Sequence, residues 1–181
     1  MNQKTRKEWI KDGVVDGEKV AKCWDPKKNE WYYLKIWQRN AKHHIDWYKW
    51  AAKQGVGVPV VEIENGIRMP VGVKLAKAVQ SRLILHGEVK FQLDMIQDCL
   101  KKNKIAHCDV KYDNCMFFPR WGVRLIDNGD MARFGVKRMI HTPNQNTTVL
   151  VPGQISGQIG PGTDEKGFKQ IIQKMNSDLG K

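Results

Sequence analysis

The stretch from His107 to Asp130 constrains the fold more than any other part of this 181-residue chain. Its sequence, HCDVKYDNCMFFPRWGVRLIDNGD, places four aspartates and two asparagines around two short apolar runs. The runs CMFF and VRLI predict two strands, and the residues PRWG between them predict a hairpin turn. Such a hairpin brings Asn114, just before the first strand, to the same edge as Asp127, which follows the second.

The segment 1–75 predicts a small antiparallel sheet with one helix. The chain is rich in Trp, Tyr and Val up to Trp37, and the turn signal DPKKN separates two of its apolar runs. Farther on, Asn65-Gly66 lies between two more apolar runs and is a strong hairpin signal. Five strands and a helix are therefore expected, with strands near 6–12, 18–24 and 30–37, a helix ending near Gly55, and two strands within 59–73.

Residues 76–181 predict a mainly helical unit. The region 76–82 predicts a linker or a short helix, and residues 136–162 predict a loop. A helix over 87–103 is expected from apolar residues that share one face, namely Val89, Leu93, Ile96 and Leu100. A last helix, with Thr163 or Asp164 as its N-cap and Gly180 as its stop, has the apolar face Phe168, Ile171, Ile172 and Met175.

The composition indicates a folded protein with a strongly basic surface. Hydrophobic residues make up 41% of the chain and charged residues 28%, values typical of a globular protein. Lys and Arg number 31 against 19 Asp and Glu, and the net charge of +12 attracts phosphates, nucleic acid, anionic membranes or acidic proteins. The charge does not choose among these partners, and no specific nucleic-acid motif accompanies it.

Targeting signals and metal-binding cysteines are not evident in the sequence. No apolar run approaches the roughly 18 residues that cross a bilayer, and the first residues lack the apolar stretch of a signal peptide. We therefore expect a cytoplasmic protein with no membrane span. The four cysteines form no C-x-x-C pair, which favours free buried thiols over a zinc site.

The polar residues of the 107–130 stretch match a known pattern. His107, Asp109 and Asn114 form H-x-D-x-x-x-x-N, and Asp127 ends an apolar run farther along the chain. This order resembles the protein kinase-like superfamily, in which H-R-D-L-x-x-x-N is the catalytic loop and D-F-G binds magnesium. The resemblance implies an α+β, bilobal kinase-like fold. It would have a five-stranded antiparallel N-lobe with one helix over 1–75 and a truncated C-lobe over 76–181, together one kinase domain.

The resemblance also implies that the chain binds ATP and Mg²⁺. Mg²⁺ held by carboxylate and amide oxygens neutralises charge on the triphosphate, and Asp127 and Asn114 are the expected ligands. Asp109 is the expected catalytic base, which receives the proton of the acceptor hydroxyl. Lys111 is expected to contact the transferred phosphate, and His107 to support the loop.

Further nucleotide-binding residues are expected in the segment 1–75. Lys35 in YYLKIW is similar to the V-A-I-K lysine, which contacts the α- and β-phosphates. Gly13 and Gly17 are the expected nucleotide-covering loop, although DGVVDGEKV departs from G-x-G-x-x-G and suits an ordinary turn equally well. Kinases pair the lysine with a glutamate, which the predicted helix lacks. Asp46, the only acid in that helix, is the expected substitute, and Glu62 is the alternative.

Departures from the family pattern indicate a kinase that is always active. Asn128 stands where D-F-G has phenylalanine, and Cys108 stands where H-R-D has the arginine that receives a phosphorylated activation loop. No A-P-E motif follows. The segment GTDEKGFKQII is similar to the start of a central C-lobe helix, in which Asp164 would bind the backbone around His107. At this size the chain looks like the minimal kinases of bacterial effectors or phages, and delivery into a host cell is one expectation.

The acceptor is expected to be a protein. DVKYDN resembles the DLKPEN of Ser/Thr protein kinases more than the H-G-D pattern of aminoglycoside and choline kinases. The segment that follows Asp130 also leaves little room for the acceptor-binding insert of the small-molecule enzymes. We therefore expect a monomer that phosphorylates Ser/Thr hydroxyls of a protein substrate, such as a host protein. A small-molecule kinase and a non-catalytic kinase-like module that binds nucleotide or protein remain as alternatives.

Overall fold

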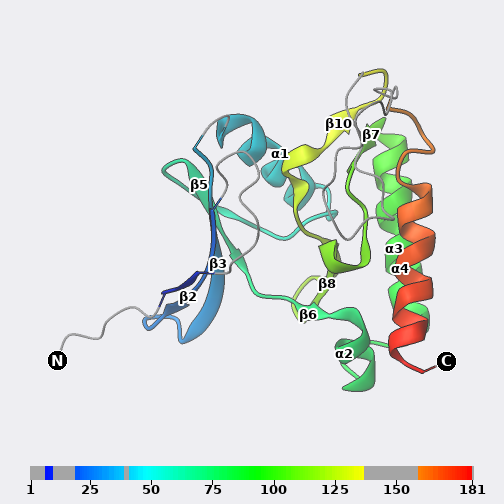
Figure 1. Ribbon diagram of the computed structural model, residues 1–181, viewed down its shortest axis with the longest axis horizontal. Coiled ribbons are helices and arrows are strands. Elements are labelled where there is room, and N and C mark those ends of the chain that lie inside the picture. Colours follow the sequence, from blue (N-terminus) through cyan, green and yellow to red (C-terminus); the bar gives the residue numbers. More distant parts are fainter. Residues whose placement is uncertain (1–6, 10–18, 39–40, 137–158, 181) are drawn as a thin grey trace.

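The computed structural model describes most of the chain, namely residues 7–9, 19–38, 41–136 and 159–180. In Figure 1 a β-sheet lies at one side of the molecule and helices α3 (His86–Lys102) and α4 (Glu165–Asp178) lie together at the other, with α1 (Ala41–Lys53) between them. The described chain is a mixed α+β structure with antiparallel sheets and four α-helices. The predicted α+β class is therefore confirmed.

The larger sheet has five antiparallel strands in the order β1-β2-β3-β5-β4. Their bounds are Lys7–Trp9 (β1), Lys19–Asp25 (β2), Glu30–Ile36 (β3), Val61–Ile63 (β4) and Gly66–Pro70 (β5). The five predicted strands are confirmed, and β1 is described over three residues of the predicted 6–12. The β4–β5 turn lies at Glu64 and Asn65, one residue earlier than predicted, and Asn65 has a φ of 53°. Gly66 begins β5 instead, where a Cβ atom would lie 2.4 Å from the carbonyl oxygen of Lys35.

Helix α1 follows the sheet's central strand and packs against the sheet. It buries Ile45, Tyr48 and Ala51, which recur at helical spacing. The chain leaves the helix at Gly55, whose φ of 71° glycine adopts without strain, so the predicted stop is confirmed. Around α1 lies a core cluster formed by Trp37, Ile45, Tyr48, Val58, Ile67, Met69 and Phe118.

The second part of the chain, which is everything after β5, combines three helices with two small sheets. Its strands are Val73–Lys74 (β6), Ile105–Ala106 (β7), Cys115–Phe118 (β8), Gly122–Leu125 (β9) and Ala132–Arg133 (β10). They form a β6-β8-β9 sheet and a β7-β10 ribbon. The predicted β8–β9 hairpin and the helices α3 and α4 are confirmed. Of the two alternatives for 76–82, the short helix is the one observed, as α2 (Leu75–Gln80).

Three short strands were not predicted. Strands β6, β7 and β10 have two residues each, too few to show the alternation that identifies a strand. Strand β10 lies just before the expected loop over 136–162 and is held by its pairing with β7. Residues 137–158 of that loop lie outside the described residues.

The larger core cluster lies in the second part of the chain. Helix α3 contributes the four residues that share its predicted apolar face, Val89, Leu93, Ile96 and Leu100. The cysteines are free thiols, and all except the half-buried Cys99 are buried. Burial raises the pKa of the Cys115 thiol. Among the described residues, no helix has both the length and the apolar character needed to cross a membrane.

Candidate functional site

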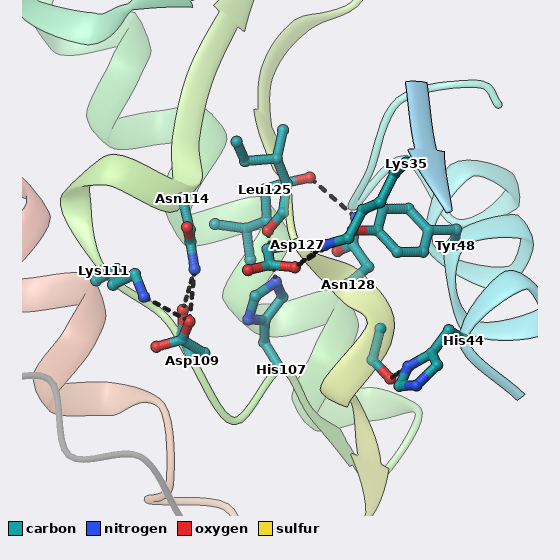
Figure 2. Close-up of polar contacts among 12 residues, drawn as sticks. Lys35, His44, Tyr48, His107, Asp109, Lys111, Asn114, Leu125, Asp127 and Asn128 are labelled. Carbon is teal, nitrogen blue, oxygen red and sulfur yellow. Dashed lines mark hydrogen bonds and ion pairs between the residues drawn. The ribbon is translucent and has the colours of Figure 1, made fainter. Parts of the chain in front are cut away.

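Five of the predicted site residues come together where the five-stranded sheet faces the second part of the chain. Figure 2 shows Asp109, Asn114 and Asp127 gathered in one region, with Lys111 on one side and Lys35 on the other. Strand β3 supplies Lys35, whereas the other four residues lie on or beside the segment from β7 to β9. The site therefore joins both parts of the chain.

The β8–β9 hairpin places two of these residues at one edge, as the sequence predicts. Asn114 directly precedes β8, and Asp127 follows β9 by two residues. The backbone N–H of Ile126 donates a hydrogen bond to the carbonyl oxygen of Asn114 over 2.8 Å. This bond joins the two ends of the hairpin.

Lys35 is buried and has a carboxylate partner. It lies opposite Ile67 of β5, and its side chain is only 5% exposed. Its Nζ lies 5.5 Å from the ring centroids of both Trp37 and Tyr48. An unpaired ammonium group in such a position would lose several kcal/mol of hydration energy. Asp127 supplies the compensating charge, with 2.5 Å between Nζ and Oδ1.

The hydrogen bonds described for the Asp127 carboxylate all use one oxygen, Oδ1. Its Oδ1 also accepts a hydrogen bond from the hydroxyl of Tyr48 over 3.4 Å, whereas none of the hydrogen bonds described for this carboxylate engages Oδ2. Burial by itself would raise the pKa of Asp127, but the attraction of Lys35 and its hydrogen bond hold that pKa below its usual value. Asp127 has a φ of 63°, in the left-handed region, which aspartate tolerates better than most residues. An ionised carboxylate with one available oxygen results.

His107 supports the turn that carries Asp127. The imidazole is completely buried, and its Nε2–H donates a hydrogen bond to the carbonyl oxygen of Ile126 over 3.1 Å. The opposite ring nitrogen, Nδ1, is buried without a hydrogen-bond partner among the described residues. The contact with Ile126 is consistent with the supporting role that was predicted for His107.

Asp109 forms a second, separate group with Lys111 and Asn114. The Lys111 Nζ lies 2.7 Å from Oδ2 of Asp109. The side-chain amide of Asn114 donates to the same Oδ2 over 2.8 Å and to the backbone oxygen of Asp109 over 3.0 Å. Since these bonds use Nδ2 of Asn114, they leave its amide oxygen available. Oδ1 of Asp109 is not used in these bonds either.

Helix α4 anchors the loop that carries Asp109. Asp164, the residue before α4, accepts hydrogen bonds from the backbone N–H groups of His107 (2.6 Å) and Cys108 (3.0 Å). These bonds confirm the contact predicted for Asp164. Burial raises the pKa of Asp164, and this outweighs the opposing effects of His107 and of the backbone bonds. Cys108 has a φ of 70°, which is uncommon outside glycine, so the loop needs this anchor.

Helix α1 contributes two residues that the sequence did not identify as part of the site. His43 and His44 are expected on the surface from sequence, but His44 is half-buried and its Nδ1–H donates to the carbonyl oxygen of Gly129 over 2.9 Å. Tyr48 is expected in the core and is buried there, but its hydroxyl also reaches Asp127. Both contacts join segments that are far apart in the sequence, so no local pattern reveals them.

The two acids proposed as partners of Lys35 are not its partners in the structure. Asp46 pairs with Lys42, one helical turn away, and Glu62 pairs with Lys49. Asp46 and Glu62 are exposed residues, whereas Lys35 is buried. The predicted pairing with Asp46 is therefore wrong, because that position of α1 faces solvent. Gly13 and Gly17 lie outside the described residues.

The chemistry of the donor set fits a Mg²⁺ ion bound together with a phosphate. Mg²⁺ is usually held by one or two carboxylates, water and substrate phosphate oxygens. Asp127 offers Oδ2 and Asn114 offers its amide oxygen, whereas the described residues hold no group of three His, Cys, Asp or Glu side chains suited to a metal. An ion at this place would therefore depend on phosphate oxygens to complete its coordination.

The comparisons with known proteins name no family for the chain. Its sequence matches no protein-family model, and none of the curated proteins is significantly similar to it.

Proposed function

We propose that this protein is a kinase-like phosphotransferase that moves the γ-phosphoryl group of ATP to a Ser or Thr hydroxyl of a protein. One observation carries the proposal. A buried lysine, two aspartates and an asparagine converge at one place from distant segments of the chain, in the order that the kinase-like pattern requires.

The proposed roles follow from the atoms that are available. Lys35 would bind the α- and β-phosphates, and Asp127 and Asn114 would hold Mg²⁺, which neutralises charge on the phosphate oxygens when it is bound. Oδ1 of Asp109 would accept the proton of the acceptor hydroxyl as its oxygen bonds to the γ-phosphorus. The bond between that phosphorus and the β,γ-bridging oxygen breaks, and ADP leaves. Lys111, beside Asp109, would contact the phosphate as it is transferred.

The surroundings of the two unusual residues support an enzyme without an activation switch. Cys108 is buried and cannot receive a phosphate as an exposed arginine does. Asn128 is 1% exposed, and its amide donates to the carbonyl oxygen of Leu125 over 3.2 Å. A residue bonded into its own turn has less freedom to change packing than an aromatic ring held by apolar contacts. We therefore propose a constitutively active kinase.

A bilobal kinase-like architecture is part of the proposal. The five-stranded antiparallel sheet with α1 would form the N-lobe over 1–75, and α2 to α4 with the β8–β9 hairpin a truncated C-lobe over 76–181. Minimal kinases of this kind occur among bacterial effectors and phages. Activity as a monomer in the cytoplasm, of the producing cell or of a host, fits such a protein.

Phosphoryl transfer can be tested with ATP labelled at the γ-phosphate. The protein is incubated with Mg²⁺ and cell lysates, alongside Asp109→Ala, Asp127→Ala and the exposed control Asp113→Ala. Label on a lysate protein with the wild type and the control, and not with the first two variants, is the expected result. Phosphoserine or phosphothreonine should then be found in that protein by mass spectrometry.

Other outcomes separate the alternatives. A melting temperature that rises with nucleotide, without any transfer, would indicate a binding module. Label on a small molecule would indicate a small-molecule kinase. A mass gain of AMP on the target would contradict phosphoryl transfer while retaining the nucleotide site.

A further inference from the structure

Helix α1 lies directly against the turn that follows Asp127, and two of its side chains reach that turn. In Figure 2, Tyr48 lies beside Lys35 and His44 lies below them, near the segment that contains Asn128. His44 and Tyr48 are one helical turn apart and therefore project from the same side of α1. The helix thus contacts Asp127 through Tyr48 and the turn that follows it through His44.

Tyr48 contacts the carboxylate itself. Its ring is 1% exposed, and its hydroxyl lies 3.4 Å from Oδ1 of Asp127, the same oxygen that Lys35 binds. Because both groups use Oδ1, the carboxylate is turned so that Oδ2 remains available. Departure of Lys35 toward bound phosphates would still leave Oδ1 with the Tyr48 hydroxyl.

His44 fixes the backbone two residues beyond Asp127. Its Nδ1–H donates to the carbonyl oxygen of Gly129 over 2.9 Å, and its ring stacks on Trp37 with 5.2 Å between centroids and 11° between planes. A Cβ atom at Gly129 would lie 2.8 Å from Nδ1 of His44, so the two segments are in close contact. Trp37 thus orients the imidazole of His44, and Gly129 accepts its hydrogen bond.

Helix α1 supplies no carboxylate to Lys35 among the described contacts. Asp46, its one acid, pairs with Lys42 on the solvent side. The helix therefore gives Lys35 the ring of Tyr48 but no carboxylate among the described contacts, and it contacts the candidate metal-binding aspartate through the hydroxyl of the same Tyr48.

We propose that His44 and Tyr48 are positioning residues that hold Asp127 and its turn ready for Mg²⁺. This inference rests on the proposed function, in which Asp127 binds the metal. Tyr48 keeps the carboxylate oriented, and His44 keeps its turn in place, when phosphates draw Lys35 away. An always-active kinase needs such a device, since no separate event brings its helix into place.

Mn²⁺ binding tests the inference, because Mn²⁺ prefers the same oxygen ligands as Mg²⁺ and is visible by electron paramagnetic resonance. Mn²⁺ affinity is measured with saturating ADP for the wild type, Tyr48→Phe, His44→Leu and His44→Asn. We expect the first two variants to weaken Mn²⁺ binding by about tenfold or more, as is typical when a partner of a metal ligand is removed. His44→Asn should restore most of the affinity, because its amide nitrogen can replace Nδ1.

A general loss of structure would change other quantities as well. ADP affinity without metal should therefore stay within about twofold of the wild type in all variants, and thermal melting should remain a single transition. Unchanged Mn²⁺ affinity in both Tyr48→Phe and His44→Leu would overturn the positioning role, as would failure of His44→Asn to restore it. The wild type could transfer no phosphate while the variants still changed Mn²⁺ affinity as expected. That result would support the positioning role and refute the proposed activity. Absence of Mn²⁺ binding in the wild type would refute both.

Discussion

The two aspartates of the site are each paired with a lysine, but the lysines come from very different distances along the chain. Lys111 lies two residues after Asp109, whereas Lys35 lies 92 residues before Asp127. The side chain of Lys111 is 44% exposed and that of Lys35 is 5% exposed. The aspartates themselves differ the other way, since the side chain of Asp109 is 16% exposed and that of Asp127 is 40% exposed. The Asp109 group is thus a local motif with an exposed lysine, and the Asp127 group is a contact between the two parts of the chain with a buried one.

This difference gives the two aspartates different environments, and the proposed function gives them different roles. The local group needs only the short loop and its anchor at Asp164, and the side-chain bonds described for it use Oδ2 of Asp109 and not Oδ1. The distant group forms only when β3, α1 and the β8–β9 hairpin are assembled. In the proposed function, Asp127 would therefore be linked both to folding and to the bound nucleotide, and Asp109 to the acceptor.

The largest expected effect separates these two roles. Asp127→Asn should weaken ADP binding in the presence of Mg²⁺ by about 10- to 100-fold, because the metal loses its charged ligand. Asp109→Asn should reduce phosphoryl transfer by about 10²- to 10⁴-fold, as expected for loss of a catalytic base, with ADP binding within about twofold. Calorimetry of ADP binding with and without Mg²⁺ measures the first effect, and initial rates measure the second. Equal weakening of ADP binding by both variants would contradict separate roles for Asp127 in metal binding and Asp109 in catalysis.

The anchor of the Asp109 loop can be tested by adding a single methyl group. A Cβ atom at Gly167 of α4 would lie 2.2 Å from the carbonyl oxygen of Val110, so Gly167→Ala should lower the free energy of unfolding by about 1–3 kcal/mol. Gly87→Ala in α3 is the matched control, because nothing lies within 4 Å of its Cβ position. That variant should be as stable as the wild type or up to about 0.5 kcal/mol more stable. Urea denaturation measures both, and similar stabilities of the two variants would contradict close packing of α4 on the loop.

The Lys35–Asp127 pair predicts a dependence of stability on pH. The pKa of Asp127 is lowered in the folded state, so the pair stabilises the protein above the unfolded carboxyl's ordinary pKa of 3.8 and loses that contribution as the pH falls through the lowered value. The contribution should be below about 1 kcal/mol, because the Asp127 side chain is 40% exposed and solvent screens the pair.

The measurement compares urea denaturation at pH 5 and pH 2.5 for the wild type and Lys35→Met. The wild type should lose more stability than Lys35→Met over this interval, since the variant lacks the interaction that lowers the pKa. Equal losses would show that Lys35 does not stabilise the charged carboxylate.

The smallest expected effect concerns the acid that sequence had assigned to Lys35. Asp46→Asn removes an exposed ion pair with Lys42, and such pairs contribute at most about 0.5 kcal/mol on a helix surface. We expect unchanged nucleotide affinity and phosphoryl transfer within about twofold of the wild type. A tenfold loss in either quantity would restore Asp46 as a functional partner of the nucleotide site.

Several elements of the fold are predictable because their signals are local. The apolar face of α3 repeats at helical spacing, and the runs CMFF and VRLI flank a turn, so α3 and the β8–β9 hairpin follow from a few neighbouring residues. The strands β6, β7 and β10 have no such signal, because each consists of two residues held by a partner elsewhere in the chain. Their existence depends on tertiary contacts.

The site divides in the same way. The sequence by itself determined the spacing of Asp109, Asn114 and Asp127, because a loop and a hairpin of fixed length bring these residues together. It did not determine the partner of Lys35 or the contacts of His44 and Tyr48. Only the tertiary structure decided these, since the direction in which a residue of α1 points depends on how the helix is rotated against the sheet and the Asp127 turn. That rotation is set by burial of residues such as Ile45 and Ala51, and it turns Tyr48 toward Asp127 and Asp46 toward solvent.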